Sequence, residues 1–357
     1  MRVLVWHWGR FGAGPRFACE LAAAFTRLPE TAAILSLSSE AELLRAAPPG
    51  MPLLAFRTYS GWLGLIGRLA ASPWLIRGLV RQLAAAEPAL AVSAMPALLD
   101  PLMVTALARL RIPYAIVIHD AESHPGDRSF LQIALQRSLI RHAALVVALS
   151  RHVATRLIRQ GVVRKERLLV ASHPPFDFGS VPERSPHDGP FRLLFFGRLR
   201  RYKGLDLLAA ALRELPAGQF AVRVVGSGPA SAELANLSVL SGVSVENRWV
   251  PEAEVAGLMA WADAVVLPYR EASQSGVAAA ALAAGRPVVA TSVGGLAQQL
   301  AGERLARLSA PEPAALAECL ARLANEPCRP APPVDANGAW TEFAARLLAV
   351  FVTVRAG

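Results

Sequence analysis

Short apolar runs alternate with longer segments in which apolar residues recur at helical spacing, and this alternation occurs twice along the chain. The runs occupy residues 2–8, 32–38, 52–57, 90–95, 114–120, 145–150 and 167–172 in the first half, and 191–197, 220–226, 243–250, 264–269 and 287–293 in the second. Continuous apolar runs between helical segments are typical of parallel strands covered on both faces. The pattern therefore predicts an α/β fold with two doubly wound lobes in tandem.

A proline-rich stretch separates the two halves. Residues 171–190 contain five prolines and show no apolar periodicity, as expected of a linker. We therefore predict a first domain at 1–170 and a second at 191–335, facing a central cleft lined by the loops at the carboxyl ends of their strands. The apolar pattern of 336–357 predicts a final amphipathic helix, which either domain could accommodate.

Basic residues are unevenly distributed along the chain. The formal net charge is +10, and residues 45–86 contain five arginines and no acidic residue. These arginines are interleaved with tryptophan and leucine, which suits an anionic membrane surface, although a solvated arginine-rich face would have the same composition. Residues 128–167 hold nine basic residues and one acidic residue. We predict no nucleic-acid partner, because no recognition-helix, aromatic-stacking or zinc pattern accompanies the charge.

The first residues and the cysteines indicate the cellular compartment in which the protein is expected. Residues 1–9 predict a β-strand, since they lack the small-residue cleavage site of a signal peptide. No uncharged apolar stretch reaches the ~20 residues that span a bilayer. Three cysteines, far apart in the sequence, form neither a disulfide framework nor a metal-ligand spacing. These features predict a cytoplasmic protein, peripheral at the inner face of the membrane.

Two cations follow a predicted strand end in the second domain. The strand ends at Gly197, a helix begins near Gly204, and Arg198 and Lys203 lie between them. A helix dipole already places positive partial charge at the N-terminus, so cations gathered there indicate a bound dianion. Lys203 is one of only two lysines in the chain. The alternative is that these side chains are solvated surface cations.

A second anion site is predicted in the same domain. A strand ends at Tyr269, and an alanine-rich helix follows whose N-terminus presents the backbone amides of Ser275, Gly276 and Val277. Gly226 ends another strand in a glycine-rich turn, which a bound ring or phosphate could approach closely. Together with the two cations, these amides would converge on a diphosphate.

The first domain offers a glycine-rich loop after its first strand. Gly12 and Gly14 precede a helix that begins near Pro15. The backbone could therefore approach a ligand closely, or the glycines could serve only a tight turn. The spacing differs from the G-x-G-x-x-G of a dinucleotide site.

Acids and histidines cluster after the fifth predicted strand. His119 and Asp120 end this strand, and Glu122, His124 and Asp127 follow. No metal-ligand spacing connects the two histidines, and the chain has no D-x-D pair that would hold a divalent ion on a diphosphate. We therefore predict no metal site and assign His119 and Asp120 to acid or base chemistry. The alternative is a loop acid that only fixes the turn.

These motifs, in this order, resemble glycosyltransferase family 4, whose members have the GT-B fold of two Rossmann-like lobes. Residues 193–296 carry the resemblance most strongly, through FFGRLRRYKGLDLL, VRVVGSGP, ADAVVLPY and SQSGVAAAALAAGRPVVATSVGGL, which are similar to the donor half of that family. GRFGAGPRFACELA and IHDAESHPGD resemble its acceptor half. The resemblance implies a nucleotide-diphosphate sugar as donor substrate, with neither a metal nor another cofactor.

The resemblance also implies roles for individual residues. The helix at 336–357 would cross back to the first domain, Gly12 and Gly14 would belong to a loop that closes against donor and acceptor, and His119 would lie near the reacting sugar. The positions corresponding to the donor site are Arg198, Lys203, Gly226, Tyr269, Glu271, Gln274, Ser275 and Gly276.

One pair of family residues is missing. The family often has two glutamates eight positions apart, where this chain has Ala272 and Ala280, with Glu271 the only nearby acid. The second glutamate normally holds the ribose of the nucleotide, so that contact must be weaker or supplied otherwise. Both stereochemical courses stay open: a retaining enzyme would use the leaving phosphate to take the proton, and an inverting one would need a carboxylate base, for which Asp120 is the candidate.

We therefore expect a metal-independent glycosyltransferase of polysaccharide biosynthesis that moves a hexose or hexuronate from a nucleotide-diphosphate sugar to a lipid-linked or polysaccharide acceptor. A nucleotide-sugar 2-epimerase and a non-catalytic binding protein are the alternatives. The missing glutamates favour the binding protein, whereas the cation pair argues against it. The expected partners are the nucleotide sugar, a lipid-linked glycan and an anionic membrane surface.

Overall fold

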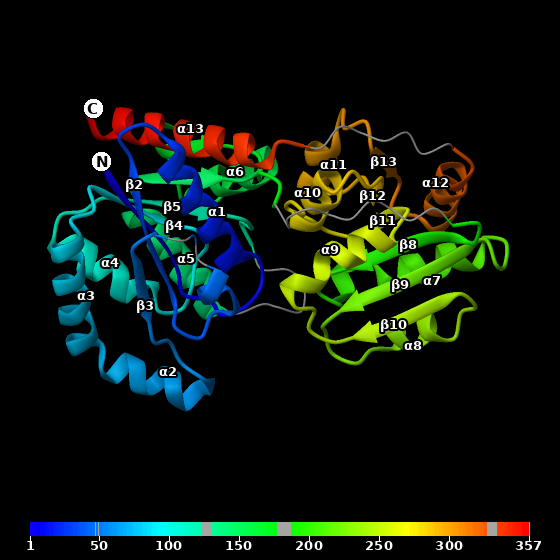
Figure 1. Ribbon diagram of the computed structural model, residues 1–357, viewed down its shortest axis with the longest axis horizontal. Helices are drawn as coiled ribbons and strands as arrows, with labels where there is room; N and C mark the ends of the chain where they lie inside the picture. The colour runs from blue at the N-terminus through cyan, green and yellow to red at the C-terminus, as the bar shows by residue number, and fades with distance from the viewer. Residues whose placement is uncertain (47, 49, 123–129, 177–186, 327–333, 357) are drawn as a thin grey trace. The chain divides into compact units, whose positions relative to one another are not determined.

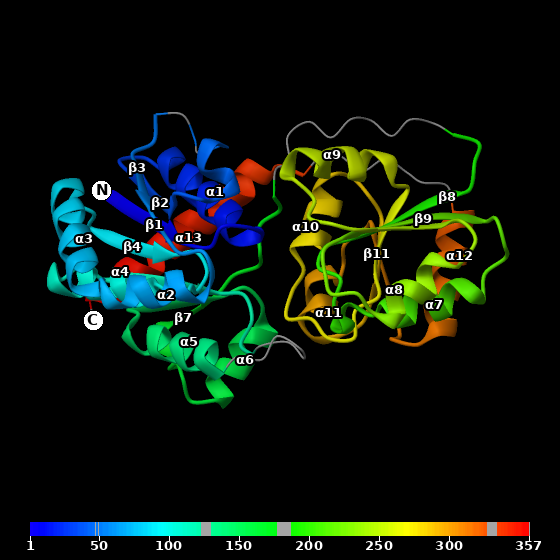
Figure 2. The same cartoon turned by 90° about the horizontal axis from the view of Figure 1, so that it is seen from below.

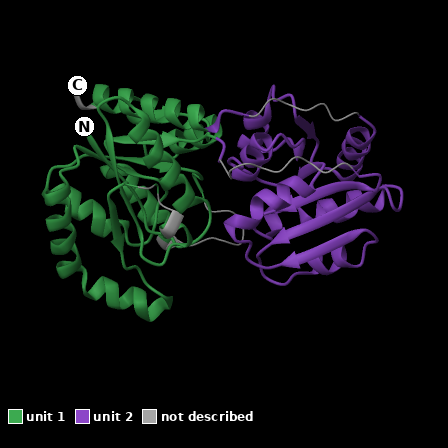
Figure 3. Ribbon diagram, viewed as in Figure 1, with its two compact units in different colours: residues 1–122, 129–174, 337–357 green, residues 123–128, 175–336 purple. Residues whose placement is uncertain are grey.

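The computed structural model describes residues 1–46, 48, 50–122, 130–176, 187–326 and 334–356. The chain forms two compact units, which Figure 3 distinguishes by colour. Unit 1 contains the described residues of 1–122, 130–174 and 337–356, and unit 2 contains those of 175–336. Each unit has its own parallel sheet and its own core.

Unit 1 is built on a parallel sheet, whose described strands number seven and follow the order β3-β2-β1-β4-β5-β6-β7. They are β1 (Arg2–His7), β2 (Ala32–Ser38), β3 (Leu53–Phe56), β4 (Leu90–Ser93), β5 (Tyr114–Ile118), β6 (Leu145–Ala148) and β7 (Leu168–Val170). Neighbouring strands all pair in parallel. The central strands β4, β5 and β6 are buried throughout, which accounts for their continuous apolar runs.

Helices cover both faces of this sheet (Figures 1 and 2). They are α1 (Ala13–Arg27), α2 (Gly61–Ala70), α3 (Ser72–Ala86), α4 (Asp100–Arg109), α5 (Phe130–His142), α6 (Arg151–Arg159) and α13 (Ala336–Ala356), with 3-10 helices η1 (Glu42–Ala46) and η2 (Lys165–Arg167). Trp6 of β1 shares a core with Leu83 of α3 and Met103 of α4. Phe17 of α1 packs edge-on against Trp340 of α13, with 4.8 Å between ring centroids. The last helix thus packs on unit 1, although unit 2 precedes it in the sequence.

Unit 2 has a second parallel sheet, of six described strands in the order β10-β9-β8-β11-β12-β13. They are β8 (Phe191–Phe196), β9 (Phe220–Gly226), β10 (Val243–Asn247), β11 (Ala264–Leu267), β12 (Val288–Thr291) and β13 (Ala306–Ser309). Its helices are η3 (Arg201–Lys203), α7 (Leu205–Arg213), α8 (Ala232–Ser238), α9 (Glu252–Trp261), α10 (Gly276–Ala283), α11 (Gly294–Leu300) and α12 (Pro313–Asn325). The predicted pair of doubly wound parallel sheets is confirmed.

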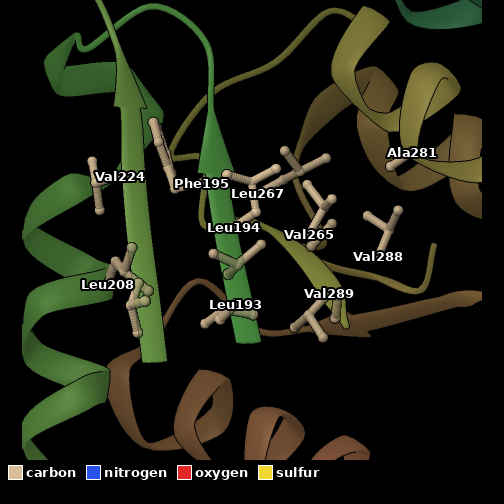
Figure 4. Close-up of a cluster of buried hydrophobic side chains, with 14 of the residues drawn as sticks. Leu193, Leu194, Phe195, Leu208, Val224, Val265, Leu267, Ala281, Val288 and Val289 are labelled. Atoms are coloured by element: carbon tan, nitrogen blue, oxygen red, sulfur yellow. The ribbon is translucent and has the colours of Figure 1, made fainter. Parts of the chain in front are cut away.

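The core of unit 2 gathers around β8. Figure 4 shows Leu193, Leu194 and Phe195 of this strand among side chains of β9, β11 and β12, and all three are fully buried. Each such side chain contributes roughly 2 kcal/mol relative to its exposed state. The pattern of apolar runs missed only the edge strand β13 among the described strands, because the exposed Arg307 interrupts the apolar residues of its sequence ARLS.

Candidate functional site

The two predicted cations lie beside two buried tyrosines of unit 2, in the loop that follows β8. Lys203 Nζ lies 3.6 Å from the ring centroid of Tyr269 and 5.2 Å from that of Tyr202. The guanidinium carbon of Arg198 lies 5.8 Å from the Tyr202 ring centroid. Both tyrosines are less than 5% exposed. An ammonium or guanidinium group over an aromatic face is attracted by the ring quadrupole. Both cations therefore lie against the Tyr202 ring, and Lys203 also lies over Tyr269.

Tyr269 connects these cations with helix α10. It follows β11, is fully buried, and its hydroxyl lies 3.4 Å from Ser275 Oγ. Burial raises the pKa of Tyr269 to about 12, while the hydrogen bond to Ser275 and the charge of Arg198 act in the opposite direction. The phenol is therefore neutral at physiological pH, and its ring remains a platform for Lys203.

The N-terminus of α10 offers two of the three backbone amides that the sequence predicted. Ser275 caps the helix, with its Oγ accepting from the Ala278 N–H at 3.2 Å. Gln299 of α11 binds the Ser275 backbone twice: its Oε1 accepts from the Ser275 N–H at 2.7 Å, and its Nε2 donates to the Ser275 carbonyl at 2.9 Å. The Ser275 N–H is therefore unavailable to a ligand, and the amides of Gly276 and Val277 remain at the first turn.

Two cations thus lie beside the rings of Tyr202 and Tyr269, and the Tyr269 hydroxyl lies at the N-cap residue of α10. Arginine offers a planar fork of donors and lysine a compact point charge, and a helix N-terminus attracts anions through its free amides and its dipole. This combination of groups is suited to a dianion such as a diphosphate.

Gly226 lies where two loops of unit 2 meet backbone to backbone. A Cβ at Gly226 would lie 1.7 Å from the Gly197 carbonyl oxygen, and one at Gly228 would lie 2.0 Å from the Leu199 carbonyl oxygen. The loops after β8 and β9 therefore need glycine for their contact with each other. This packing explains Gly226 without reference to a ligand.

The remaining predicted residues of unit 2 flank the α10 N-terminus in sequence. Glu271 is exposed and Gln274 is half-buried in the loop between β11 and α10. Ala272 and Ala280, at the positions of the family glutamates, are 7% and 2% exposed and belong to the unit 2 core. Their methyl groups are packed, so the fold around them is adapted to alanine.

His119 lies in an aromatic cluster in the interior of unit 1. Its ring is edge-on to Phe17 of α1 and to His173, with ring centroids 5.0 and 5.8 Å apart. Its Nε2 lies 3.0 Å from the Ala94 carbonyl oxygen, and burial lowers the pKa of His119. The imidazole is therefore neutral and packed at the carboxyl end of β5.

The acids predicted near His119 are only partly in the described chain. Asp120 is half-buried, and its backbone carbonyl accepts from Gln136 Nε2 at 2.9 Å. Glu122 pairs with Arg156 at 2.8 Å. His124 and Asp127 lie outside the described residues. Within the described ranges, no three His, Cys, Asp or Glu side chains form a group that could hold a metal ion.

His7, the last residue of β1, lies beside the glycine-rich loop and was absent from the sequence-based predictions. Its Nδ1 lies 3.0 Å from the Met95 carbonyl and so donates to it, and burial lowers the pKa of His7 to about 4. A Cβ at Gly9 or at Gly14 would lie 2.3 Å from His7 Nε2, whereas one at Gly12 would meet nothing within 4 Å. Gly12 instead has a φ of 87°, a backbone conformation that favours glycine. A polar residue ending an apolar strand just before three glycines was the available signal.

Gly14→Ala is expected to lower the free energy of unfolding by about 2 kcal/mol, because the new methyl group would overlap the buried His7 ring. In a His7→Ala background the same change should cost far less, since the ring is gone. Urea denaturation of the two single variants and the double variant measures this coupling. Gly67→Ala in α2, where a Cβ would meet nothing within 4 Å, is the control. Strictly additive effects would contradict the contact.

Acid is expected to destabilise unit 1 through its buried histidines. Burial lowers the pKa of His7 to about 4 and that of His173 to about 3. These values lie below the pKa of an unfolded histidine. The stabilisation of the folded state by the two neutral histidines is therefore complete above pH ~6.5 and is lost as the pH falls. Between pH 7 and 5 each should lower the free energy of unfolding by roughly 2 kcal/mol.

Asp100 opposes this trend, because burial raises its pKa to about 7, so its contribution increases as the pH falls through that value. Denaturation at both pH values tests the assignment. His173→Phe should make the loss on acidification smaller and Asp100→Asn should make it larger, and an unchanged pH dependence in both would contradict it.

One pocket among the described residues lies at the other edge of the unit 2 sheet. It has a volume of about 580 Å³, and its lining includes Phe191, Gln219 and Asp263, at the amino ends of β8, β9 and β11. Ligands of doubly wound sheets bind at the carboxyl ends of the strands. None of the predicted site residues lines this pocket, so we do not assign the function to it.

Two protein-family models match the chain. The model described as Glycosyl transferase 4-like domain matches residues 12–173, and the model described as Glycosyl transferases group 1 matches residues 190–326. Together they cover both units on either side of the linker.

Individual proteins are similar as well. D-inositol 3-phosphate glycosyltransferase 1 of Catenulispora acidiphila is 33% identical over 257 residues, which cover 63% of this chain and 61% of that protein. A GDP-mannose:glycolipid 4-beta-D-mannosyltransferase of Xanthomonas campestris is 32% identical over 113 residues, 28% of this chain and 30% of that protein. This chain therefore spans about three fifths of the first relative and less than a third of the second.

A solved structure extends the likeness to the whole fold. The HepE protein of Anabaena, solved in complex with UDP and glucose, superposes with a TM-score of 0.69 over 99% of this chain and 98% of that chain. The sequence identity is 21%. At this identity the likeness shows the fold alone, which is the GT-B fold with two Rossmann-like lobes.

Proposed function

This chain belongs to the family 4-like glycosyltransferases of the GT-B fold, and from that premise we propose that it transfers a hexose or hexuronate from a nucleotide-diphosphate sugar to a lipid-linked or polysaccharide acceptor. Unit 2 binds the donor and unit 1 binds the acceptor. The observation that carries the proposal is the grouping of Arg198 and Lys203 beside the rings of Tyr202 and Tyr269, with the Tyr269 hydroxyl at the N-cap residue of α10.

The proposed site acts on the charge of the leaving group. In the transfer the bond between the sugar C1 and the diphosphate oxygen breaks, and its electron pair stays on the diphosphate. The acceptor oxygen forms the new bond to C1 and gives its proton to the leaving phosphate in a retaining reaction, or to the Asp120 carboxylate in an inverting one. Negative charge develops on the terminal phosphate, where Arg198, Lys203 and the amides of Gly276 and Val277 would stabilise it. The counter-charge thus comes from the protein, and the proposal assigns no role to a metal or a further cofactor.

The acceptor and the location of the enzyme follow from composition and from the relatives. One relative is named for transfer to a glycolipid, and unit 1 contains the arginine-rich segment 45–86 without acids. We infer a peripheral enzyme at the cytoplasmic face of a membrane, which there meets a lipid-linked glycan during polysaccharide biosynthesis. HepE, which shares the fold, was solved with UDP and glucose bound, which supports a nucleotide sugar as the donor.

Incubation of the purified protein with a panel of labelled nucleotide sugars tests the proposal, with and without a lipid-linked acceptor. Transfer of label to the acceptor, persisting in excess EDTA, is the expected result. Formation of an isomeric nucleotide sugar without acceptor would instead indicate a 2-epimerase. Binding without either reaction would indicate a non-catalytic protein. Each of these two outcomes would overturn the proposal.

A further inference from the structure

The outward face of helix α2 is apolar. Trp62, Leu63, Ile66 and Leu69 are 72, 86, 59 and 52% exposed, whereas Leu65 is buried in the unit 1 core. At 3.6 residues per turn, the four exposed side chains lie within about one third of the helix circumference. A surface helix of a globular protein normally turns its polar face outwards. The outward face of α2 is therefore apolar where a polar face is expected.

The one charged residue of α2 points back towards the protein. Arg68 Nε donates to the Thr58 carbonyl at 2.9 Å, and the Arg68 side chain is half-buried. The outward face thus has no charge of its own, and the fold leaves an apolar stripe on the surface that packing within unit 1 does not cover. Exposed apolar patches of this kind mark interaction sites.

Arginines without acidic partners adjoin this stripe on helix α3. Trp74, in the first turn of α3, is 70% exposed, and Arg77 and Arg81 follow three and seven positions later on the same exposed face. Within the described part of the chain, neither arginine makes an ion pair. No acidic residue occurs between Glu42 and Glu87. Along α2 and α3 themselves, the apolar stripe is therefore accompanied by positive charge and by no acidic residue.

The junction of the two helices sets their relative direction. No single helix among the described residues is long and apolar enough to cross a bilayer, and α2 and α3, which meet the length and composition conditions as a pair, bend by 72° at their junction. Figure 1 shows α2 leaving the end of α3 at the lower edge of unit 1. A helix in this orientation can lie flat in an interface while the next helix rises from it.

The spacing along α3 matches the layers of such an interface. At ~1.5 Å per residue, Arg77 lies about 4.5 Å and Arg81 about 10 Å along the helix from Trp74. An interfacial helix buries its apolar face about 5–10 Å into the boundary between headgroups and acyl chains. With Trp74 at that boundary, both arginines reach the level of the lipid phosphates.

We propose that α2 and the first three turns of α3 form a docking surface for an anionic lipid bilayer. The apolar stripe (Trp62, Leu63, Ile66, Leu69 and Trp74) enters the interface, and Arg77 and Arg81 contact lipid phosphates. Charge selects this occupant over a second copy of the chain, because a self-complementary contact would bring the same unpaired arginines together. The inference deepens the proposed function and rests on it in one respect: transfer to a lipid-linked acceptor is the reason for the enzyme to dock on a membrane.

Flotation with vesicles tests the surface. The wild-type protein should bind vesicles of phosphatidylcholine and phosphatidylglycerol, bind phosphatidylcholine alone much more weakly, and lose binding at high salt. Trp62→Ser combined with Leu63→Ser should lower binding at least ten-fold. Arg77→Gln and Arg81→Gln should each lower it about five-fold, on anionic vesicles only. Matched controls in unit 2 are Val239→Ser, at a side chain 78% exposed, and Arg304→Gln, at an exposed arginine, and neither should change binding.

Three results would overturn the docking surface. They are wild-type binding that does not depend on anionic lipid, binding that survives the Trp62→Ser, Leu63→Ser change, and loss of a dimer rather than of vesicle binding in that variant. The variants should keep the wild-type thermal unfolding midpoint and nucleotide-sugar binding. Vesicle binding by a protein that transfers no sugar would count against the proposed function alone, so the two failures are distinguishable.

Discussion

Lys203→Ala is expected to lower kcat by about 10²- to 10³-fold, the loss typical for removal of one preorganised group that stabilises developing negative charge. The Lys203 ammonium lies 3.6 Å from the Tyr269 ring centroid, and a cation–π contact of this kind contributes only about 1 kcal/mol to stability. The variant should therefore fold normally and lose turnover. Steady-state kinetics on the nucleotide sugar and urea denaturation measure the two effects separately.

Arg201→Ala is the matched control for this prediction. Arg201 belongs to the same short helix η3 as Lys203, but its side chain is exposed, so its removal should leave kcat nearly unchanged. Lys203→Arg keeps the charge in a different shape and should retain part of the activity. Wild-type turnover in Lys203→Ala, or an equal loss in Arg201→Ala, would contradict the assignment of Lys203 to the leaving group.

The parallel sheets could be predicted because their signal is local. Buried parallel strands such as β5 and β8 are continuous apolar runs. A serine N-cap or a preceding glycine marks where a helix begins. The same locality made Arg198 and Lys203 visible, since both lie between a strand end and a helix start. Features that one segment of the chain determines alone were therefore within reach of sequence reasoning.

The rest depends on contacts between distant segments. The Gln299 side chain, 24 positions away in sequence, occupies the Ser275 N–H and so makes it unavailable to a ligand. Position 14 requires glycine because the His7 ring leaves no room for a Cβ there. Neither partner has a pattern that identifies the other. The outward apolar face of α2 is a similar case: the periodicity gives the stripe, but only the tertiary structure shows that Trp62 faces solvent.

Gly204→Ala is expected to cost at least ~3 kcal/mol of unfolding free energy and to weaken nucleotide-sugar binding. Gly204 has a φ of 67°, and a Cβ there would lie 1.7 Å from the Pro268 carbonyl oxygen. The left-handed conformation alone costs a non-glycine residue about 1–2 kcal/mol. The overlap adds to this cost, because a backbone oxygen cannot rotate aside as a flexible side chain could, so the backbone itself must shift. Because Pro268 precedes Tyr269 and Gly204 follows Lys203, the displacement would separate the ring from the ammonium group.

Gly218→Ala separates these two contributions. Gly218, also in unit 2, has a φ of 80°, and a Cβ there would meet nothing within 4 Å. This control should therefore show the conformational cost alone, about 1–2 kcal/mol, with unchanged nucleotide-sugar binding. Urea denaturation and a binding titration of both variants give the comparison. Equal losses of stability would mean that the backbone contact of Gly204 with Pro268 adds nothing, and intact binding in Gly204→Ala would remove the link between that contact and the position of Lys203.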